Sequence, residues 1–295
     1  MSQLTAPTQG LPETVSAARP ASLAHYARWF RKRMLLTLSL ASLLTAVLLS
    51  LLGPSVFHLN DLAMNTNAVL SPPSARYLMG TDEYGRSVFA RVVFGIRLSL
   101  SVGIAVALVT GCIGTSLGLL AAWYRSLDTV VMRLMDGLMA FPSILLALAL
   151  MAVIGPGTVN TVVVLSVVFL PATVRVVRAS AMTVAQMEYI VAARAAGAST
   201  PRLLVLHVLP NIVTPVLVQQ TFTLAWAILG EATLSFVGAG TPPPTPSLGN
   251  ILSEAQNLLY QAEWLALYPG LAIAWLVLSV NLVGDGLRDL FGQGS

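Results

Sequence analysis

Six long apolar stretches constrain the fold more than any other feature of this sequence. They cover residues 34–52, 98–122, 137–154, 159–174, 212–237 and 265–283. A helix that crosses a bilayer needs about 17–25 mostly apolar residues, and all six stretches reach or approach that length. Only 9% of the residues are charged, whereas roughly 25% is typical of a soluble domain. The sequence therefore predicts an all-α membrane protein with six transmembrane helices.

The first stretch, residues 34–52, follows a basic run as a secretory signal would. It is longer than the apolar region of a signal peptide, which has about 7–15 residues, and no small-residue cleavage site of the A-x-A type follows it. We therefore expect a retained first transmembrane helix. Residues 1–33, which begin with a stretch rich in Ser, Thr, Ala and Pro, are expected to form a largely disordered cytoplasmic tail.

The basic residues predict the orientation of the helices. With the N-terminus inside the cell, twelve of the 16 Lys and Arg residues fall in cytoplasmic segments and four fall outside. Those four are Arg76, Arg86, Arg91 and Arg97. Cytoplasmic loops carry the excess of Lys and Arg, so both termini are expected in the cytoplasm. Residues 53–97 would then form an external loop with an interfacial helix, and the net charge of +4 would reflect orientation rather than binding of nucleic acid.

Several functions are excluded by residues that the sequence lacks. Lys32 is the only lysine, and its neighbours rule out a phosphate-binding loop of the form G-x-x-x-x-G-K-[ST]. No G-x-S-x-G, H-E-x-x-H or paired-cysteine pattern is present, so no catalytic residue is predicted. His25, His58 and His207 lie far apart in the sequence, and no metal site is expected from them. Transport driven by ATP would need an ATPase on another chain.

Residues 188–210 interrupt the apolar pattern between the fourth and fifth stretches. Their first part is rich in alanine, the best helix former, and Gly197 would end that helix. Thr200 as the cap and Pro201 as the first helical residue suit the start of a second short helix. The segment therefore predicts a helical hairpin on the cytoplasmic face.

Three interpretations of this hairpin remain open from its pattern alone. It is an amphipathic connector on the bilayer surface, a DNA-binding helix-turn-helix, or a unit that docks into a partner protein. The DNA-binding interpretation fits poorly, because the unit is tethered between spans and carries only two arginines. In the docking interpretation small side chains enter a groove and charges at the rim fix the orientation. The small residues are Ala192, Ala193, Ala195 and Ala196, and the rim residues are Glu188, Arg194 and Arg202.

The hairpin resembles the E-A-A loop of permease subunits in binding-protein-dependent ABC importers. The family pattern is E-A-A-x-x-x-G, then nine residues, then I-x-L-P. The matching residues are Ala192, Ala193, Gly197, Leu209 and Pro210. Val191 stands in place of the Glu and His207 in place of the Ile. The resemblance implies that residues 188–210 dock on an ATPase, without a salt bridge at position 191.

A second segment resembles the signature of the dipeptide, oligopeptide and nickel permeases, G-T-D-x-x-G-R-D…S-R…G-x-R-x-S-L. The matching residues are Gly80, Thr81, Asp82, Gly85, Arg86, Arg91, Gly95, Arg97, Ser99 and Leu100. Ser87 replaces the usual Asp and Ala90 the usual Ser. From the residues themselves, 80–82 predict a turn and a cap. Phe89, Val92, Val93 and Ile96 predict an apolar stripe that anchors an interfacial helix to the membrane surface.

Further matches to the family are DGLMAFPSILLALAL, EATLSFVGAGTPPPTPSLGNIL and YPGLAIAWLVLSVNLVGDGLRD. With them the resemblance runs from about Gly80 to Asp289 and identifies the chain as a member of this permease subfamily, the second permease of its pair. They imply a type I ABC importer permease fold, with residues 98–289 as its transmembrane core, in the bacterial inner membrane. The implied partners are a homologous permease, two ATPase subunits that bind ATP and Mg, and an external binding protein. This chain would bind no cofactor. We expect peptides as substrates, with glutathione, nickel or metal chelates as alternatives.

Glu231 is the one carboxylate placed well inside a predicted span. A carboxylate there faces protein or water, so three roles remain: lining the translocation pathway, pairing across the permease interface, or bonding to neighbouring helices. A rival function, a self-sufficient secondary transporter, predicts inverted repeats and ionisable residues at mid-membrane. The sequence shows neither clearly.

Overall fold

The structure, a computed structural model, describes the backbone of residues 23–291 and the side chains of residues 34–290. Within this part of the chain all regular structure is helical, apart from one isolated β-bridge between Thr81 and Ser87. The long helices are α1 (Leu23–Val56), α2 (Val88–Trp123), α3 (Arg125–Met139), α4 (Ser143–Ile154), α5 (Thr158–Ala185), α8 (Leu209–Phe236) and α10 (Trp264–Phe291). The short ones are η1 (Thr66–Ala68), α6 (Glu188–Ala195), α7 (Thr200–Arg202), the π-helix η2 (Leu203–Val208) and α9 (Leu248–Ala255).

Five helical segments are long and apolar enough to cross a membrane. They are 34–56 within α1, α2, α5, the continuous segment from α7 to α8, and α10. The third predicted span is instead a broken pair, because α3 and α4 meet at an angle of 93°. Pro142 stands immediately before α4, where its missing N–H and fixed φ favour a break in the helix. The prediction of an all-α membrane protein is confirmed, with a bent third span.

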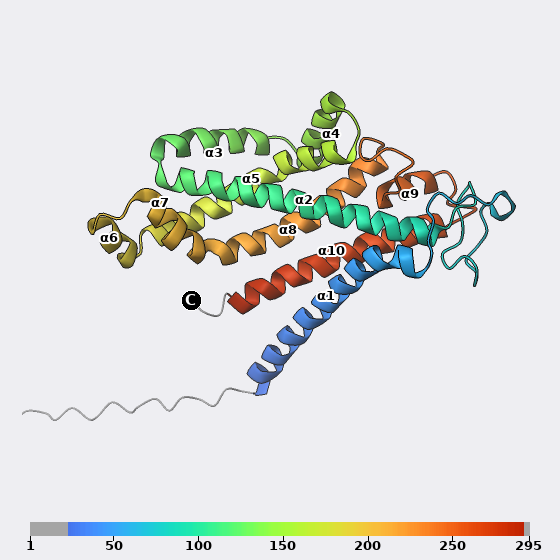
Figure 1. The fold of residues 1–295 in the computed structure, drawn as a ribbon, viewed down its shortest axis with the longest axis horizontal. Coiled ribbons are helices and arrows are strands. Elements are labelled where there is room, and N and C mark those ends of the chain that lie inside the picture. The colour runs from blue at the N-terminus through green and yellow to red at the C-terminus, as the bar shows by residue number, and fades with distance from the viewer. Residues whose placement is uncertain (1–22, 292–295) are drawn as a thin grey trace, which may run out of the picture.

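The start of α1 differs from the prediction. The helix begins at Leu23, whereas residue 34 was the expected start, so part of the predicted tail is helical. Residues 1–22 of that tail lie outside the described residues. Helix α1 packs on α10 at the edge of the bundle (Figure 1). The Ser42 hydroxyl lies 2.8 Å from the Ser279 hydroxyl and accepts a bond of 2.7 Å from the Trp275 indole N–H.

Helix α2 lies at the centre of the bundle and packs on both α5 and α8 (Figure 1). Two glycines four residues apart allow α5 to approach closely. A Cβ on Gly114 would lie 2.6 Å from a Thr173 methyl group, and a Cβ on Gly118 would lie 2.7 Å from Val177. Small residues at this spacing permit the close helix packing that stabilises membrane bundles.

Helix α5 extends to Ala185, well beyond the predicted end at residue 174. The prediction stopped where Arg175 and Arg178 interrupt the apolar pattern. In the structure Arg175 Nη2 donates to Asp136 Oδ1 at 2.6 Å, and Arg178 donates to both carboxylate oxygens of Asp128. These two pairs join α5 to α3; the Arg178–Asp128 pair is partly buried, whereas the Arg175–Asp136 pair is exposed.

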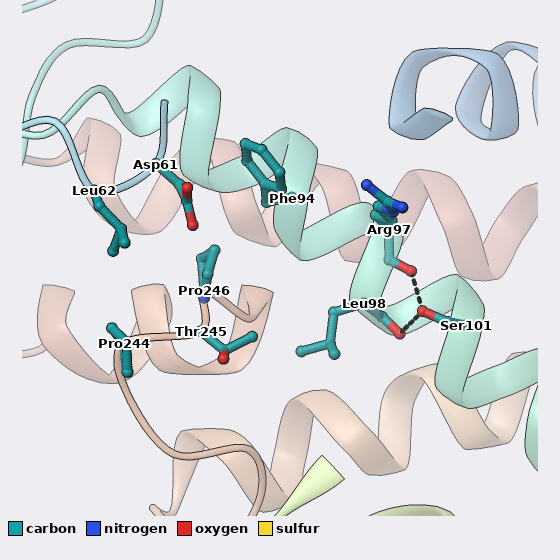
Figure 2. Close-up of a pocket in the computed structure, with 9 residues that line it drawn as sticks. All are labelled: Asp61, Leu62, Phe94, Arg97, Leu98, Ser101, Pro244, Thr245 and Pro246. Atoms are coloured by element: carbon teal, nitrogen blue, oxygen red, sulfur yellow. Dashed lines mark hydrogen bonds between the residues drawn. The ribbon is translucent and has the colours of Figure 1, made fainter. Parts of the chain in front are cut away.

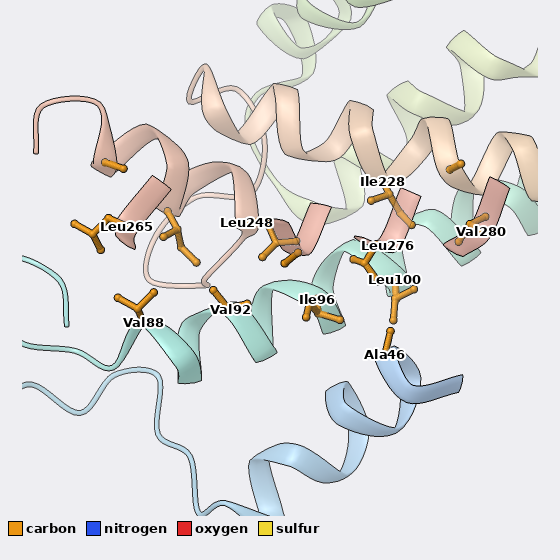
Figure 3. Close-up of a cluster of buried hydrophobic side chains, with 14 of the residues drawn as sticks. Ala46, Val88, Val92, Ile96, Leu100, Ile228, Leu248, Leu265, Leu276 and Val280 are labelled. Carbon is orange, nitrogen blue, oxygen red and sulfur yellow. The ribbon is translucent and has the colours of Figure 1, made fainter. Parts of the chain in front are cut away.

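A large cluster of buried apolar side chains joins α1, α2, α8, α9 and α10 (Figure 3). Val92 and Ile96 belong to it, so the stripe expected to face the membrane surface packs on protein instead. The expected interfacial helix is also not separate, because α2 runs from Val88 to Trp123 without a break. Ser87 caps its start and accepts a hydrogen bond from the Ala90 N–H.

Candidate functional site

Helices α6 and α7 form a hairpin at one end of the molecule, which we call the hairpin end. The loop 57–87 and α9 lie at the opposite end, the loop end (Figure 1). Ile190 is fully buried and anchors α6. It belongs to a small apolar cluster that includes Val184 of α5 and Val208 of η2. This cluster fixes the hairpin to the bundle and leaves the remaining face of α6 uncovered.

The predicted docking residues lie mostly on that uncovered face. Ala192, Ala195 and Ala196 are exposed and Ala193 is half-buried. Of the other expected docking residues, Glu188, Arg194, Arg202 and Pro210 are exposed and Leu209 is half-buried. The hairpin therefore presents a surface of small side chains with charged residues nearby.

Gly197 ends α6 as the sequence predicted. Its φ of +88° lies in the left-handed region, where side chains other than glycine are strained. The Gly197 N–H donates to Arg194 O at 3.0 Å and the Ala198 N–H donates to Ala193 O at 3.1 Å. These two bonds make a Schellman motif, the usual end of a helix at glycine.

The second hairpin helix differs from the prediction in its cap and in its end. Ser199, rather than Thr200, is the residue before the helix, and its side chain makes no capping bond. The helix does not stop at Pro210, because α7, η2 and α8 follow one another without a gap. In the π-helix the Leu209 N–H donates to Leu204 O, five residues back. A π-helical turn accommodates extra residues in a continuing helix, so the hairpin is joined directly to the fifth span.

Arg194 makes a contact within the subunit that the sequence did not predict. Its guanidinium carbon lies 4.4 Å from the centre of the Trp123 ring. Trp123 is the last residue of α2 and packs against the apolar cluster under the hairpin. The contact connects the hairpin to the central helix of the bundle.

At the loop end, Asp82 is the centre of a buried ion cluster. Its carboxylate accepts from Arg86 Nε at 2.6 Å and from Arg91 Nη1 at 2.8 Å. The N–H groups of Tyr84 and Arg86 also donate to it, each at 2.9 Å. The predicted turn at residues 80–82 is present, because Asp82 accepts from the N–H two residues ahead as turn-forming Asp residues do.

Glu254 of α9 completes this ion cluster, and sequence analysis missed it. Both of its carboxylate oxygens accept from the Arg91 guanidinium, at 2.5 and 2.9 Å. Arg91 is only 3% exposed, so its charge depends on these partners. Glu254 is separated from Arg91 by 163 positions, and no local pattern links them. The cluster holds loop 57–87 against α9.

The other signature residues of the external segment strengthen the same junction. The Thr81 hydroxyl donates to Ala68 O, and the Thr81 carbonyl accepts from the Trp264 indole N–H at 3.1 Å. Gly80 and Gly85 both have φ near +70°, and a Cβ on Gly85 would lie 2.0 Å from Asn65 O. These residues therefore position the loop on α10, whereas Arg97 lies outside the cluster and is exposed.

Glu231 is fully buried inside this subunit. Its carboxylate accepts from the Ser99 hydroxyl at 2.8 Å and from the Ser235 hydroxyl at 2.9 Å. Ser99 belongs to α2, so the contact joins α2 to α8. Of the three roles considered for Glu231, this geometry favours bonding between neighbouring helices. Within residues 34–290, whose side chains the structure describes, no group of three or more His, Cys, Asp or Glu side chains is placed to hold a metal ion.

Comparisons with known proteins place this chain in a family. The family model described as binding-protein-dependent transport system inner membrane component matches residues 114–294. A putative peptide transport system permease protein of Brucella suis biovar 1 is 41% identical over 291 residues, which is 98% of this chain and 97% of the relative. The di/tripeptide transport system permease protein of Pseudomonas aeruginosa is 42% identical over 254 residues, or 84% of each chain.

Two further comparisons bear on substrate and fold. The glutathione transport system permease protein of Pectobacterium atrosepticum is 42% identical over 218 residues, covering 74% of this chain and 72% of the relative. The solved structure of the inward-facing MetNI methionine ABC transporter matches with a TM-score of 0.56 at 21% identity. That match covers 68% of this chain and 95% of the other, and it shows a shared fold. The chain belongs to the family of inner-membrane permease components of binding-protein-dependent transport systems, in which the ATPase activity lies on separate subunits.

Proposed function

We propose that this chain is one of two homologous permease subunits in an ATP-driven importer of peptides. The other subunits are two ATPases, which bind ATP and Mg, and an external binding protein that delivers the substrate. Three relatives support peptides as the substrate, because their names assign them to transport of peptides, di- and tripeptides, and glutathione, itself a tripeptide.

The hairpin is the proposed docking site for an ATPase. The observation that carries this proposal is the exposed surface of small side chains beside the left-handed turn at Gly197. Small side chains let a helix enter a groove closely, and the rim charges of Glu188 and Arg202 fix its orientation. The hairpin has its own buried anchor and is continuous with α8, so movement of an ATPase would be transmitted to the bundle as a rigid-body displacement.

The proposed orientation places the hairpin end and both termini in the cytoplasm. The loop end, with the ion cluster and α9, then faces the binding protein.

ATP binding would bring the two ATPases and their docked hairpins together and open the pathway to the outside, and hydrolysis would reset it. The energy for this cycle comes from ligands that bind one state better than the other.

Reconstitution tests the proposed function. The chain is to be purified together with a homologous permease, two ATPase chains and a binding protein from the same organism, and placed in proteoliposomes. We expect uptake of short peptides that requires ATP, the binding protein and both permeases, and no ATP hydrolysis by this chain alone. Peptide uptake by this chain alone would contradict the proposal and favour a secondary transporter.

Cysteine labelling tests the orientation. In a Cys112→Ser background, Ser199→Cys at the hairpin turn should be shielded from an impermeant thiol reagent in spheroplasts, whereas Thr245→Cys before α9 should be labelled. Both positions are exposed in the subunit, so accessibility reports the side of the membrane. Labelling of Ser199→Cys from outside would reverse the proposed orientation.

A further inference from the structure

A pocket at the loop end lies apart from both the hairpin and the ion cluster. It is an open pocket with a volume of about 330 Å³, and it is lined by α2, the loop around residue 61 and the segment 244–246 (Figure 2). This volume lies at the lower end of the roughly 300–1,000 Å³ typical of small-molecule sites. The pocket is therefore large enough for a small ligand and too small for a folded segment.

Arg97 and Asp61 bring two opposite charges to this pocket. Among the side chains of residues 34–290, neither charged group has an ion pair or a side-chain hydrogen bond. The Ser101 hydroxyl donates to the main-chain carbonyl of Arg97, a bond that does not involve the guanidinium. Arg86 and Arg91, on the same segment, are both paired with Asp82. The Arg97 guanidinium thus differs from its neighbours in having its donors free for a ligand.

An apolar surface separates the two charges. Phe94 lies between Asp61 and Arg97 on the wall formed by α2 (Figure 2). Leu62 and Leu98 also line the pocket. Arg97 and Leu98 follow Phe94 on α2 by three and four residues, so each of their side chains lies next to Phe94 on the helix surface. The pocket combines an anionic group, an apolar middle and a cationic group.

We propose that this pocket receives the substrate peptide, with Arg97 bound to its terminal carboxylate and Asp61 to its terminal ammonium group. The inference rests on the proposed function and adds a substrate site on this subunit. A guanidinium pairs with a carboxylate through two parallel hydrogen bonds, and Phe94 and Leu98 contact the apolar part between the termini. The free termini of a short peptide match the two charges and the apolar surface between them.

The depth of the pocket agrees with this role. Arg97 precedes Trp123, the last residue of α2, by 26 positions, which corresponds to about 39 Å along the helix. A bilayer with its headgroups is about 40–45 Å thick. The proposed orientation places Trp123, beside the hairpin, at the cytoplasmic membrane surface. The pocket then lies near the outer membrane surface, where a binding protein releases its substrate.

Binding of a dipeptide to the assembled complex tests the site. The complex of both permeases and both ATPases, without binding protein, is placed in phosphatidylcholine nanodiscs, and binding of labelled dialanine is measured by equilibrium dialysis. We expect binding at roughly millimolar concentration, weakened about tenfold by Arg97→Gln and by Asp61→Asn, since each removes one charge-assisted contact. Arg76→Gln, at an exposed arginine of loop 57–87, is the control and should leave the affinity unchanged.

Blocked dipeptides separate the two charges. Dialanine amide lacks the terminal carboxylate, so wild type and Arg97→Gln should bind it with equal affinity. N-acetyl-dialanine lacks the terminal ammonium group, so wild type and Asp61→Asn should bind it with equal affinity. Equal dialanine affinity in wild type and both variants, or no binding to wild type at all, would overturn the site. So would an Arg97→Gln effect confined to bound phospholipid in native mass spectrometry, which would assign the pocket to a lipid headgroup.

Peptide uptake by the complex with its binding protein tests the proposed function separately from the pocket. If the wild-type complex with its binding protein takes up peptides and both variants do so equally well, only the pocket proposal fails. If the wild-type complex takes up no peptide, the proposed function fails as well.

Discussion

The guanidinium of Arg194 lies over the ring of Trp123, 4.4 Å from its centre. Arg194 is in the last turn of α6 and Trp123 ends α2, so this contact joins the hairpin to the central helix. Contacts between a cation and an aromatic ring contribute about 0.5–1 kcal/mol at exposed sites and about 2 kcal/mol when desolvated. Arg194 therefore has a partner inside the subunit in addition to the docking role proposed for it.

We predict that Arg194→Met loosens the hairpin by removing this contact. Amide hydrogen exchange in residues 188–199 should become faster in the purified complex, and ATPase association should weaken. Trp123→Leu should have the same effect, and the double variant should be no worse than the stronger single variant, because both remove one interaction. Arg202→Met, at an exposed arginine of the same hairpin, is the control for exchange. Unchanged exchange in Arg194→Met would show that the residue acts only at the docking surface.

A matched pair of glycines tests the turn at Gly197. A Cβ would meet nothing within 4 Å at Gly197 or at Gly137, but only Gly197 has a left-handed φ. We expect Gly197→Ala to cost about 1–2 kcal/mol of local stability and to reduce ATPase copurification and uptake. Gly197→Asn should be milder, because Asn tolerates this conformation, and Gly137→Ala in α3 should be neutral. Equal behaviour of Gly197→Ala and Gly137→Ala would remove the argument for a conformationally defined docking turn.

The ion cluster at the loop end predicts a large effect on stability. Glu254→Gln takes a charged partner from Arg91, which is nearly fully buried. Leaving a buried charge unpaired costs about 3–5 kcal/mol, reduced here because the Glu254 side chain is 25% exposed and Asp82 remains. We expect a lower thermal midpoint for the purified complex and faster proteolysis of loop 57–87. Glu263→Gln, at an exposed carboxylate near the start of α10, is the control, and identical midpoints for both variants would contradict the prediction.

Glu231 gives a test that separates a structural role from a role in transport. Gln keeps the shape of the side chain and can still bond to Ser99 and Ser235, whose hydroxyls both donate and accept. Glu231→Gln should therefore retain assembly and most of the uptake. Glu231→Leu leaves the two serines without their partner, at about 1–3 kcal/mol for each buried group, and should lower the yield of assembled complex. Normal assembly of Glu231→Gln with abolished uptake would instead assign its charge to the transport pathway.

The family was predicted from sequence motifs, and the comparisons confirm it. The prediction was possible because each motif is a local pattern that can be read without knowing how the helices pack. The sequence did not predict which contacts the residues of those motifs make. Asp82, Arg86 and Arg91 were recognised as a signature, but their contacts with one another were not predicted, and the helix that follows them is not a separate interfacial helix, since α2 is continuous and buried there. Their fourth partner, Glu254, lies 163 positions from Arg91, and nothing in its own neighbourhood indicates the pairing.

The sequence by itself determined which segments are apolar enough to span the membrane and where α6 must end at Gly197, because both depend on properties of a few consecutive residues. Tertiary structure decided how far the helices extend and which charges are tolerated. Arg175 and Arg178 of α5 are paired with Asp136 and Asp128 of α3, and nothing in the local sequence of α5 indicates these partners. Likewise Glu231 is buried because serines from α2 and α8 meet its carboxylate. A charge is stable in an apolar bundle when packing supplies its partner, and packing is a property of the whole chain.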